Sequence, residues 1–195
     1  LNALVTVGSF DSYYQSLGAS WSTKKFITST KVFLNNAQND FVFLNKNIFP
    51  AKRETRDHSA LYQKGILQQN YWQPTAQHLL TLKFWYHDNT YEVPNPSSVS
   101  RQAEAIEQNT FYRTLAGWHF NHRLFELNYQ GAFIKHDLDY TDPSANIDSK
   151  STFNTMINNM EVNFLVLKGV SMTSGINHTW EQGMADAFGT CTPNR

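Results

Sequence analysis

Seven histidines are the residues of this chain that most readily suggest chemistry, because an imidazole can bind a metal ion or transfer a proton. His119 and His122 lie three residues apart, but they flank a short connection and do not share a helical face. A zinc site needs four converging ligands, and the single cysteine, Cys191, offers only one thiolate. We therefore expect no metal site and place the histidines at the wet face or the rim of the fold, including the scattered residues His58, His78, His87, His136 and His178.

Carboxylate, amide and hydroxyl side chains gather between residues 137 and 148. Calcium binds clusters of such oxygen ligands in loops. The spacing does not follow the EF-hand pattern, and Lys135 and Lys150 bracket the stretch and can neutralise it. We expect a solvated loop here, with loop calcium as the alternative; the residues concerned are Asp137, Asp139, Asp142, Ser144, Asn146 and Asp148.

Motifs for covalent catalysis or phosphate binding do not occur in the sequence. There is no Gly-x-Ser-x-Gly nucleophile elbow and no glycine-rich phosphate loop. Cys191 lies in a segment, residues 183–195, that lacks the pattern of the sequence before it. We therefore expect the protein not to be an enzyme, with no catalytic residue and no cofactor.

Composition restricts the classes to which the chain can belong. Its 195 residues carry 16 basic and 16 acidic side chains, so no net field favours nucleic acid as a partner. Charged residues make up only 16% and aromatic residues 14%, a balance that suits a surface in contact with something other than bulk water. No run of about 20 apolar residues occurs, which excludes a membrane-spanning helix. Membrane strands escape this test because every second residue is polar.

Alternation of apolar and polar residues predicts β-strands with one apolar face and one hydrated, or wet, face. Leu82 and Phe84 share one face, for example, while Lys83 takes the other. The segments that show this most clearly are Ser12–Ser22, Leu79–His87, Leu124–Lys135 and Met156–Phe164.

The wet faces of these strands are expected to line a hydrated interior. Hydration is the ordinary role of such side chains, and contact with a passing ligand or an internal domain is the alternative. The residues concerned are Lys83, Glu126, Gln130, Glu161 and Asn163.

Connections between the predicted strands are alternately short and long. This asymmetry is typical of the antiparallel strands of outer-membrane barrels, which have small periplasmic turns and large external loops. We also expect a short helix, Arg101–Glu107, inside one long loop. The short links are Thr23–Lys25, Gln73–Gln77, Phe120–Arg123 and Val166–Gly169, and the long ones are Lys46–Arg56, Asn89–Ala105 and Asp137–Lys150.

Strand length and tryptophan positions also favour the strands of a membrane barrel. The segment His58–Trp72 would extend about 50 Å at about 3.3 Å per residue, far longer than strands of soluble proteins. Trp21, Trp72 and Trp118 each lie just before a short turn, where amphipathic rings would form a girdle at a membrane interface. The alternative is that these rings pack at the end of a soluble sandwich.

Several local patterns together resemble a known family. The opening strand is followed by Gly8-Ser9-Phe10, and Asn39-Asp40-Phe41 tops the third strand. The remaining patterns are Gly65-x-x-Gln68-Gln69-Asn70-Tyr71, the rise of Leu79–Trp85 into a loop bearing Val93-Pro94, and Asp137-Leu138-Asp139-Tyr140. On these residues the chain is similar to the TonB-dependent outer-membrane receptors, among them the cobalamin-receptor-like branch.

The resemblance implies an all-β fold in which residues 1–182 form part of an antiparallel transmembrane β-barrel. We expect about eight strands, against about 22 in the family's complete barrel. The plug domain, the TonB box and a signal peptide do not occur in these residues, and residues 183–195 are expected to be an irregular tail of foreign or natural origin. We therefore expect a fragment that neither inserts nor transports alone, because its edge strands would lack partners.

The function implied by the resemblance is active transport at the bacterial outer membrane. The protein would bind a scarce nutrient, cobalamin or a metal chelate such as a siderophore, at its long external loops. The TonB complex, acting through the plug, would supply energy for import, and outer-membrane lipid would surround the barrel. Two alternatives stay open: a passive porin-like channel, and a soluble β-sandwich that binds a ligand.

Overall fold

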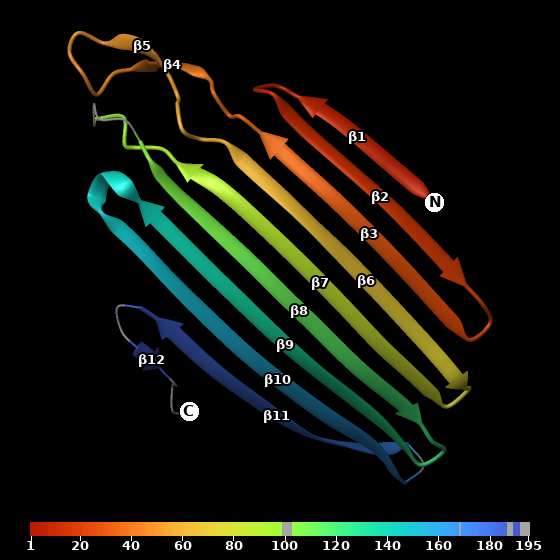
Figure 1. Ribbon diagram of the computed structural model, residues 1–195. Coiled ribbons are helices and arrows are strands. Elements are labelled where there is room, and N and C mark those ends of the chain that lie inside the picture. Colours follow the sequence, from red (N-terminus) through yellow and green to blue (C-terminus); the bar gives the residue numbers. More distant parts are fainter. Residues whose placement is uncertain (99–102, 168, 187–188, 192–195) are drawn as a thin grey trace.

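The computed structural model describes residues 1–98, 103–167, 169–186 and 189–191 of the chain, and most of them belong to one antiparallel sheet (Figure 1). The sheet has ten strands in the order β1-β2-β3-β6-β7-β8-β9-β10-β11-β12, so each strand pairs with its neighbour in sequence within the sheet. A separate hairpin, β4 (Val42–Asn45) and β5 (Lys52–Thr55), stands between β3 and β6. The predicted all-β antiparallel fold is confirmed.

Most strands are much longer than those of soluble proteins, and β10 reaches 21 residues. The expected number of about eight strands is too low, since ten pair in the main sheet. The strand β12 has three residues, too few for alternation to be visible, and forms by pairing with Gly183–Ala185. The bounds are β1 Asn2–Gly8, β2 Ser12–Ser22, β3 Phe26–Ala37, β6 Leu61–Thr75, β7 His78–Val93, β8 Ala105–Asn121, β9 Phe125–Asp142, β10 Ile147–Leu167, β11 Val170–Ala185 and β12 Gly189–Cys191.

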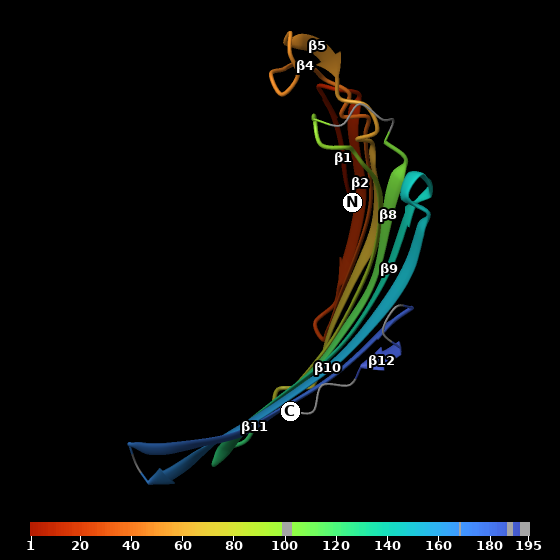
Figure 2. The ribbon, with the colours of Figure 1, turned by 90° about the vertical axis from the view of Figure 1, so that its left-hand side faces the viewer.

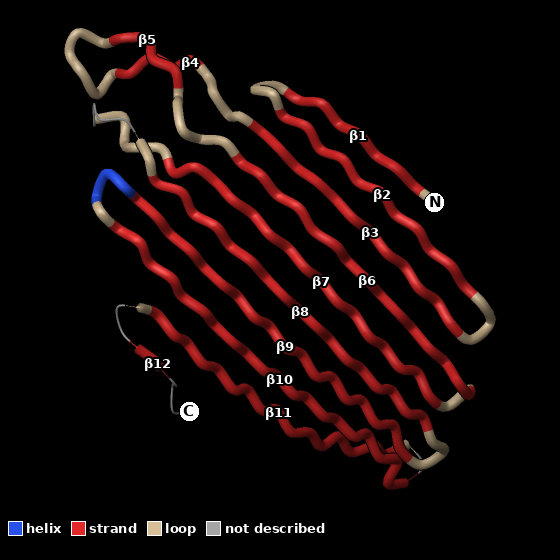
Figure 3. Tube along the Cα trace, viewed as in Figure 1, coloured by secondary structure: helices blue, strands red, loops and turns tan. Residues whose placement is uncertain are grey.

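The four predicted short links all lie at one end of the sheet, which we call the turn end (Figure 3). Backbone hydrogen bonds close two of them: Thr23 N donates to Phe26 O at 2.7 Å, and His122 N donates to Phe125 O at 2.9 Å. The Thr23 hydroxyl also accepts from the backbone N–H of Phe26 at 3.0 Å. These polar turn residues satisfy the backbone where the chain reverses.

The opposite end, which we call the loop end, has shorter loops than predicted. Strand β5 (Lys52–Thr55) lies within the first predicted loop, and β7 continues through Val93 into the second; the largest difference is at the third. Asp137–Lys150 is not a long loop, because β9 continues through Asp142 and β10 begins at Ile147. A single 3₁₀ turn, Pro143–Ala145, joins the two strands, and Asp142 Oδ1 accepts hydrogen bonds from Ser144 N at 3.0 Å and Ala145 N at 3.3 Å. The alternation continues here with its faces exchanged: Asp137 and Asp139 lie on one face, Leu138 and Tyr140 lie on the other, and the backbone ladder runs through these strand ends.

Two further boundaries are also corrected. Ala105–Glu107 begins β8 and is not helical, while residues 101 and 102 of the predicted helix lie outside the described residues. Extended pairing with β7 overrides the weak helical tendency of this stretch. The strand β11 runs through Ala185, past the predicted boundary at 182, so the segment expected to be irregular begins as strand.

Strand register places every strand side chain on one of two faces, because directly paired residues point the same way. Glu126 pairs with Asn163, and Glu161 pairs with Asn128, so these side chains share one face. Lys83 and Gln130 lie on that same face by the ladder through β8. We call it the polar face; all five residues predicted to be wet belong to it.

The sheet is a single curved layer with almost no enclosed core (Figure 2). Among the described residues, Ala37 and Ala105 are the only buried hydrophobic residues. No second sheet covers the ten-stranded one in the described part of the chain, so the packed pair of sheets that a β-sandwich needs does not occur there. Within those same residues, no helix is both long enough and apolar enough to cross a membrane.

Candidate functional site

A band of apolar side chains crosses the face opposite the polar one, which we call the apolar face. On each of four adjacent strands the band occupies nine residues, read at alternate positions. Nine residues extend about 30 Å along a strand, which is a membrane-strand length. The four segments are His78–Tyr86, Tyr112–Phe120, Phe125–Phe133 and Met156–Phe164.

The band ends sharply toward the loop end. The next positions on the same face are polar or charged on every strand, and two of the side chains form ion pairs. Lys64 Nζ lies 3.8 Å from Asp88 Oδ1, and Lys135 Nζ lies 2.8 Å from Asp137 Oδ2. These four border positions are Asp88, Thr110, Lys135 and Asn154.

Asp137 lies beyond this border, outside the apolar band. Burial raises the pKa of its carboxyl, but hydrogen bonds from Lys135 and Thr152 outweigh burial and hold the pKa below its ordinary value. The Thr152 hydroxyl donates to Asp137 Oδ1 at 2.8 Å. Asp137 is therefore an ionised, internally paired carboxylate.

Aromatic side chains border the band at the turn end. Trp21, Trp72 and Trp118, which the sequence placed before short turns, all lie on the apolar face and are 59%, 50% and 37% exposed. The Trp118 indole donates to His78 Nδ1 at 3.1 Å, and the Trp21 ring lies 6.1 Å from that of Phe26. The rings expose apolar surface while one polar group finds a partner, as at a lipid–water interface.

Polar side chains on the apolar face, inside the band and beside it, bond to one another. The Tyr129 hydroxyl donates to Asn158 Oδ1 at 2.8 Å. On β3 and β6, Thr28 donates to Asn70 Oδ1 at 2.8 Å, and Gln68 Nε2 donates to the same oxygen at 2.8 Å. The hydrogen bonds remove part of the penalty that these groups would incur against an apolar medium.

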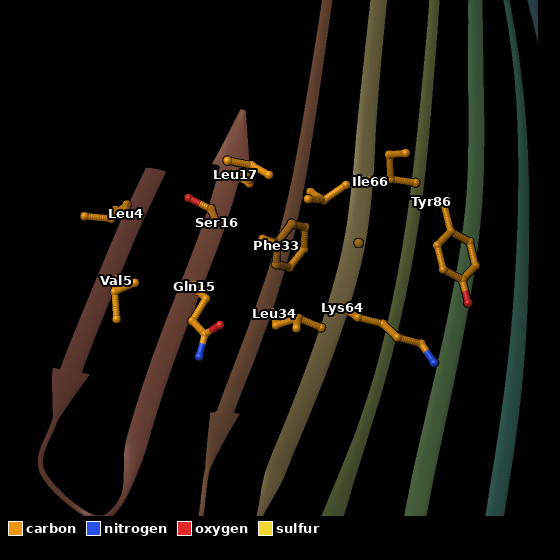
Figure 4. Close-up of a pocket in the computed structure, with 12 residues that line it drawn as sticks. Leu4, Val5, Gln15, Ser16, Leu17, Phe33, Leu34, Lys64, Ile66 and Tyr86 are labelled. Carbon is orange, nitrogen blue, oxygen red and sulfur yellow. The ribbon is translucent and has the colours of Figure 1, made fainter. Parts of the chain in front are cut away.

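An open groove lies on the part of the sheet formed by β1, β2, β3, β6 and β7 (Figure 4). Its volume is about 520 Å³, and aliphatic side chains dominate its lining. Gln15, Ser16 and Lys64 are the only polar residues among those that line it, so we interpret the groove as relief on the apolar face rather than a specific site. Its aliphatic lining includes Val5, Leu17, Val32, Leu34 and Ile66.

The candidate ligand site is a polar pocket of about 970 Å³ at the loop end, between the β4–β5 hairpin and the connection that follows β7. Asn45, only 2% exposed, ties the two walls together. Its Nδ2 donates to Glu54 Oε2 at 2.8 Å within the hairpin and to Ser97 O at 2.7 Å across the pocket. Arg56 adds a second bridge, donating to Asn95 O at 3.3 Å.

His58 and Glu92 also line this pocket, and each contacts neighbouring groups. His58 Nε2 lies 2.6 Å from Ala105 O, and its Nδ1 lies 3.6 Å from Glu92 Oε1. Glu92 Oε2 in turn accepts the backbone N–H of Ala60 at 3.0 Å. The pocket thus combines fixed donors and acceptors of both charges, and its volume suits a small molecule.

Two of the three long loops predicted to face a ligand, Lys46–Arg56 and Asn89–Ala105, therefore meet in one pocket. The third, Asp137–Lys150, contributes strands and a tight turn instead. The aspartates of that segment are spread over these strands, and the described residues contain no group of three or more His, Cys, Asp or Glu side chains placed to hold a metal ion.

Most of the remaining histidines lie apart from the pocket. His119 Nδ1 lies 2.6 Å from Asn128 Oδ1 on the polar face, and His122 lies in a turn. His178 is exposed on β11, and its pairing with Asn158 places it on the apolar face, so the expectation of the wet face or the rim is wrong for this residue. His87 and His136 share the polar face with a row of aromatic rings.

Sequence reasoning missed this row, which comprises Phe33, His87, Phe111, His136 and Phe153. We call it the aromatic row. Each of the five residues comes from a different strand and belongs to the alternate positions that form one face of that strand. The alternation was visible in the sequence, but only the register shows that the five residues align. Successive ring centroids are separated by 5.7, 6.1, 4.0 and 5.8 Å.

Comparison with known proteins gives no family assignment: no family model matches the chain, and no curated protein matches it.

Proposed function

We propose that this sheet is part of the wall of a transmembrane β-barrel in an active outer-membrane receptor. The receptor binds a scarce nutrient at its loop end and imports it with energy supplied through TonB. The observation that carries the proposal is the apolar band: nine residues on each of four strands, bounded by aromatic rings at one end and charges at the other. A bilayer requires this combination of width and borders.

The single-layered sheet supports the same proposal. Large hydrophobic side chains such as Leu82, Phe133 and Met160 are 50%, 44% and 43% exposed, with no second layer over them in the described residues. In water so much continuous apolar surface would drive association. In a bilayer the lipid chains cover it. Because β1 and β12 do not pair with each other in the described residues, further strands would close the barrel.

The pocket at the loop end favours a receptor over a passive channel. The contacts of Asn45, Arg56 and His58 hold two separate connections in a fixed arrangement, and binding sites often consist of loops on a rigid frame. A porin-like channel needs no such pocket. The nutrient is proposed to be a small chelate or cobalamin on the resemblance alone.

The experiment that tests membrane insertion uses nitroxide spin labels in the full-length protein reconstituted into lipid vesicles. Labels at Leu82, Phe84 and Leu127 should collide with oxygen dissolved in lipid. Labels at Lys83 and Asn128 should collide with a water-soluble nickel relaxant. Equal accessibility of both groups to the aqueous relaxant would contradict the proposal.

A further inference from the structure

Arg113 lies on the polar face with its charge against aromatic rings. Its Cζ is 4.6 Å from the ring centroid of Trp85 and 4.4 Å from that of Phe111. In the part of the chain that the structure describes, its side chain has no hydrogen bond and no carboxylate partner. A half-buried guanidinium with free N–H groups is a strong donor for an anion.

No acidic side chain of the described residues pairs with Arg113. Its paired neighbours are Trp85 on β7 and Ile134 on β9. The nearby cation Lys83 also lies over an aromatic ring, 5.5 Å from the centroid of Tyr71. Arg113 and Lys83 thus both lie against aromatic rings, and neither has a carboxylate partner in the described residues. The region is therefore complementary to negative charge.

The nearest acid toward the loop end on β8 is Glu107, and it already has partners. Its Oε1 accepts from the Tyr91 hydroxyl at 2.8 Å and from Asn109 Nδ2 at 2.8 Å. Glu107 also stands six residues away along the strand, which corresponds to about 20 Å. It therefore cannot serve as the counter-ion of Arg113.

The aromatic row supplies a stacking surface beside this charge. Phe111 and His136 lie with ring centroids 4.0 Å apart and planes within 13°, directly next to Arg113 in the register. Gly65 permits the row to continue across β6, since a Cβ there would lie 2.4 Å from Cε1 of Phe33. Trp85 is 39% exposed and borders the same region.

We propose that Arg113 and the adjoining rings form a binding site for a small planar ring that carries a carboxylate. The two rings against the guanidinium leave its N–H edge to donate two parallel hydrogen bonds to the carboxylate, while the ligand ring stacks on the exposed edge of the row. The occupant follows from charge complementarity, because two cations face this region without a carboxylate partner in the described residues, while Glu107, the acid toward the His136 end of the row, is already hydrogen-bonded to Tyr91 and Asn109.

This site goes beyond the proposed nutrient pocket and does not depend on it. Arg113 stands eight residues along β8, about 26 Å, from Ala105, whose carbonyl contacts the pocket residue His58. Binding to the polar face also does not require that the opposite face meet lipid.

The test compares 4-fluorobenzoate with its uncharged isostere 4-fluorobenzamide by ¹⁹F NMR line broadening on the full-length folded protein. Micelles without protein, where detergent is used, correct for partition of the probes. Benzoate should bind about tenfold or more tightly than benzamide, the ratio expected for a charge-assisted bidentate contact. Arg113→Gln should abolish this preference, and Arg113→Lys should restore only part of it.

Arg123→Gln, which removes a cation from the tight turn between β8 and β9, is the matched control and should keep the preference. Circular dichroism of each variant verifies the fold, and Arg113→Lys retains the charge if Arg113→Gln fails to fold. Equal binding of benzoate and benzamide to the native protein would overturn the proposal. Full benzoate preference in either Arg113 variant would overturn it as well.

Discussion

Replacing Leu82 by arginine would measure what medium covers the apolar face. Leu82 stands at the middle of the His78–Tyr86 segment, four residues from either end, and is 50% exposed. Four residues correspond to about 13 Å of strand on each side. The substitution would therefore place a charge near the midplane of a bilayer if the proposed function is right.

The expected magnitude depends on depth. An arginine on the lipid face of a barrel costs about 2–4 kcal/mol at the midplane and about 0–1 kcal/mol near an interface. At a water-covered surface the same change would stay within about 0.5 kcal/mol. Leu82→Arg should therefore lower the free energy of unfolding by about 2–4 kcal/mol. Phe133→Arg, at the last band position before Lys135, should lower it by about 1 kcal/mol or less.

The assay is reversible urea unfolding of the full-length protein in lipid vesicles, followed by tryptophan fluorescence. Gln130→Arg, an exposed position on the polar face, is the control and should change the free energy of unfolding by no more than about 0.5 kcal/mol. The reasoning would be refuted if Leu82→Arg and Gln130→Arg had the same small effect.

Three further predictions concern packing, charge and the pocket. Gly65→Ala should lower the free energy of unfolding by about 1–3 kcal/mol, because the new Cβ would lie 2.4 Å from the Phe33 ring and 2.8 Å from Tyr86 O. Thermal unfolding measures the change, and Gly8→Ala, where the nearest atom would be 3.4 Å away, is the control. The lowered pKa of Asp137 means that its carboxylate stabilises the fold above its ordinary pKa and loses this effect as pH falls through the lowered value. Asp137→Asn should therefore flatten the acid side of the stability profile, and an unchanged acid slope would count against the Lys135 and Thr152 contacts. Asn45→Ala should open the pocket and weaken nutrient binding by about tenfold or more, since it leaves the Ser97 carbonyl and Glu54 without this donor. Limited proteolysis should cut the β4–β5 hairpin faster than in the exposed control Lys46→Ala.

The strands could be predicted from the sequence because their signal is local. Alternation in Leu79–His87 and Leu124–Lys135 depends only on residues two positions apart, and the turn residues near Thr23 and His122 mark where each run stops. The prediction was wrong at Asp137–Lys150, where the alternation continues with its faces exchanged. Asp137 and Asp139 lie on the face that is apolar farther along β9, so the pattern there was taken for a solvated loop although the backbone ladder runs through it.

The candidate sites were only partly predictable because their contacts are not local. Asn45 donates a hydrogen bond to Ser97 O, 52 residues away, and the local sequence of neither segment predicts this contact. The sequence could predict that Lys46–Arg56 and Asn89–Ala105 are exposed, but it could not predict that they line one pocket. The alignment of His87, Phe111 and His136 likewise depends on strand register, which single-strand patterns leave undetermined.

The strictly sequential strand order has a consequence for how such a sheet can change in size. Since every strand of the main sheet bonds only to its neighbours along the chain, the hairpin of β8 and β9 is a modular unit. Removal of this hairpin would place β7 beside β10, and the two strands would still be antiparallel. Duplication of the hairpin would widen the sheet by two strands. Evolution or engineering can thus adjust the circumference in hairpin steps without rethreading the chain.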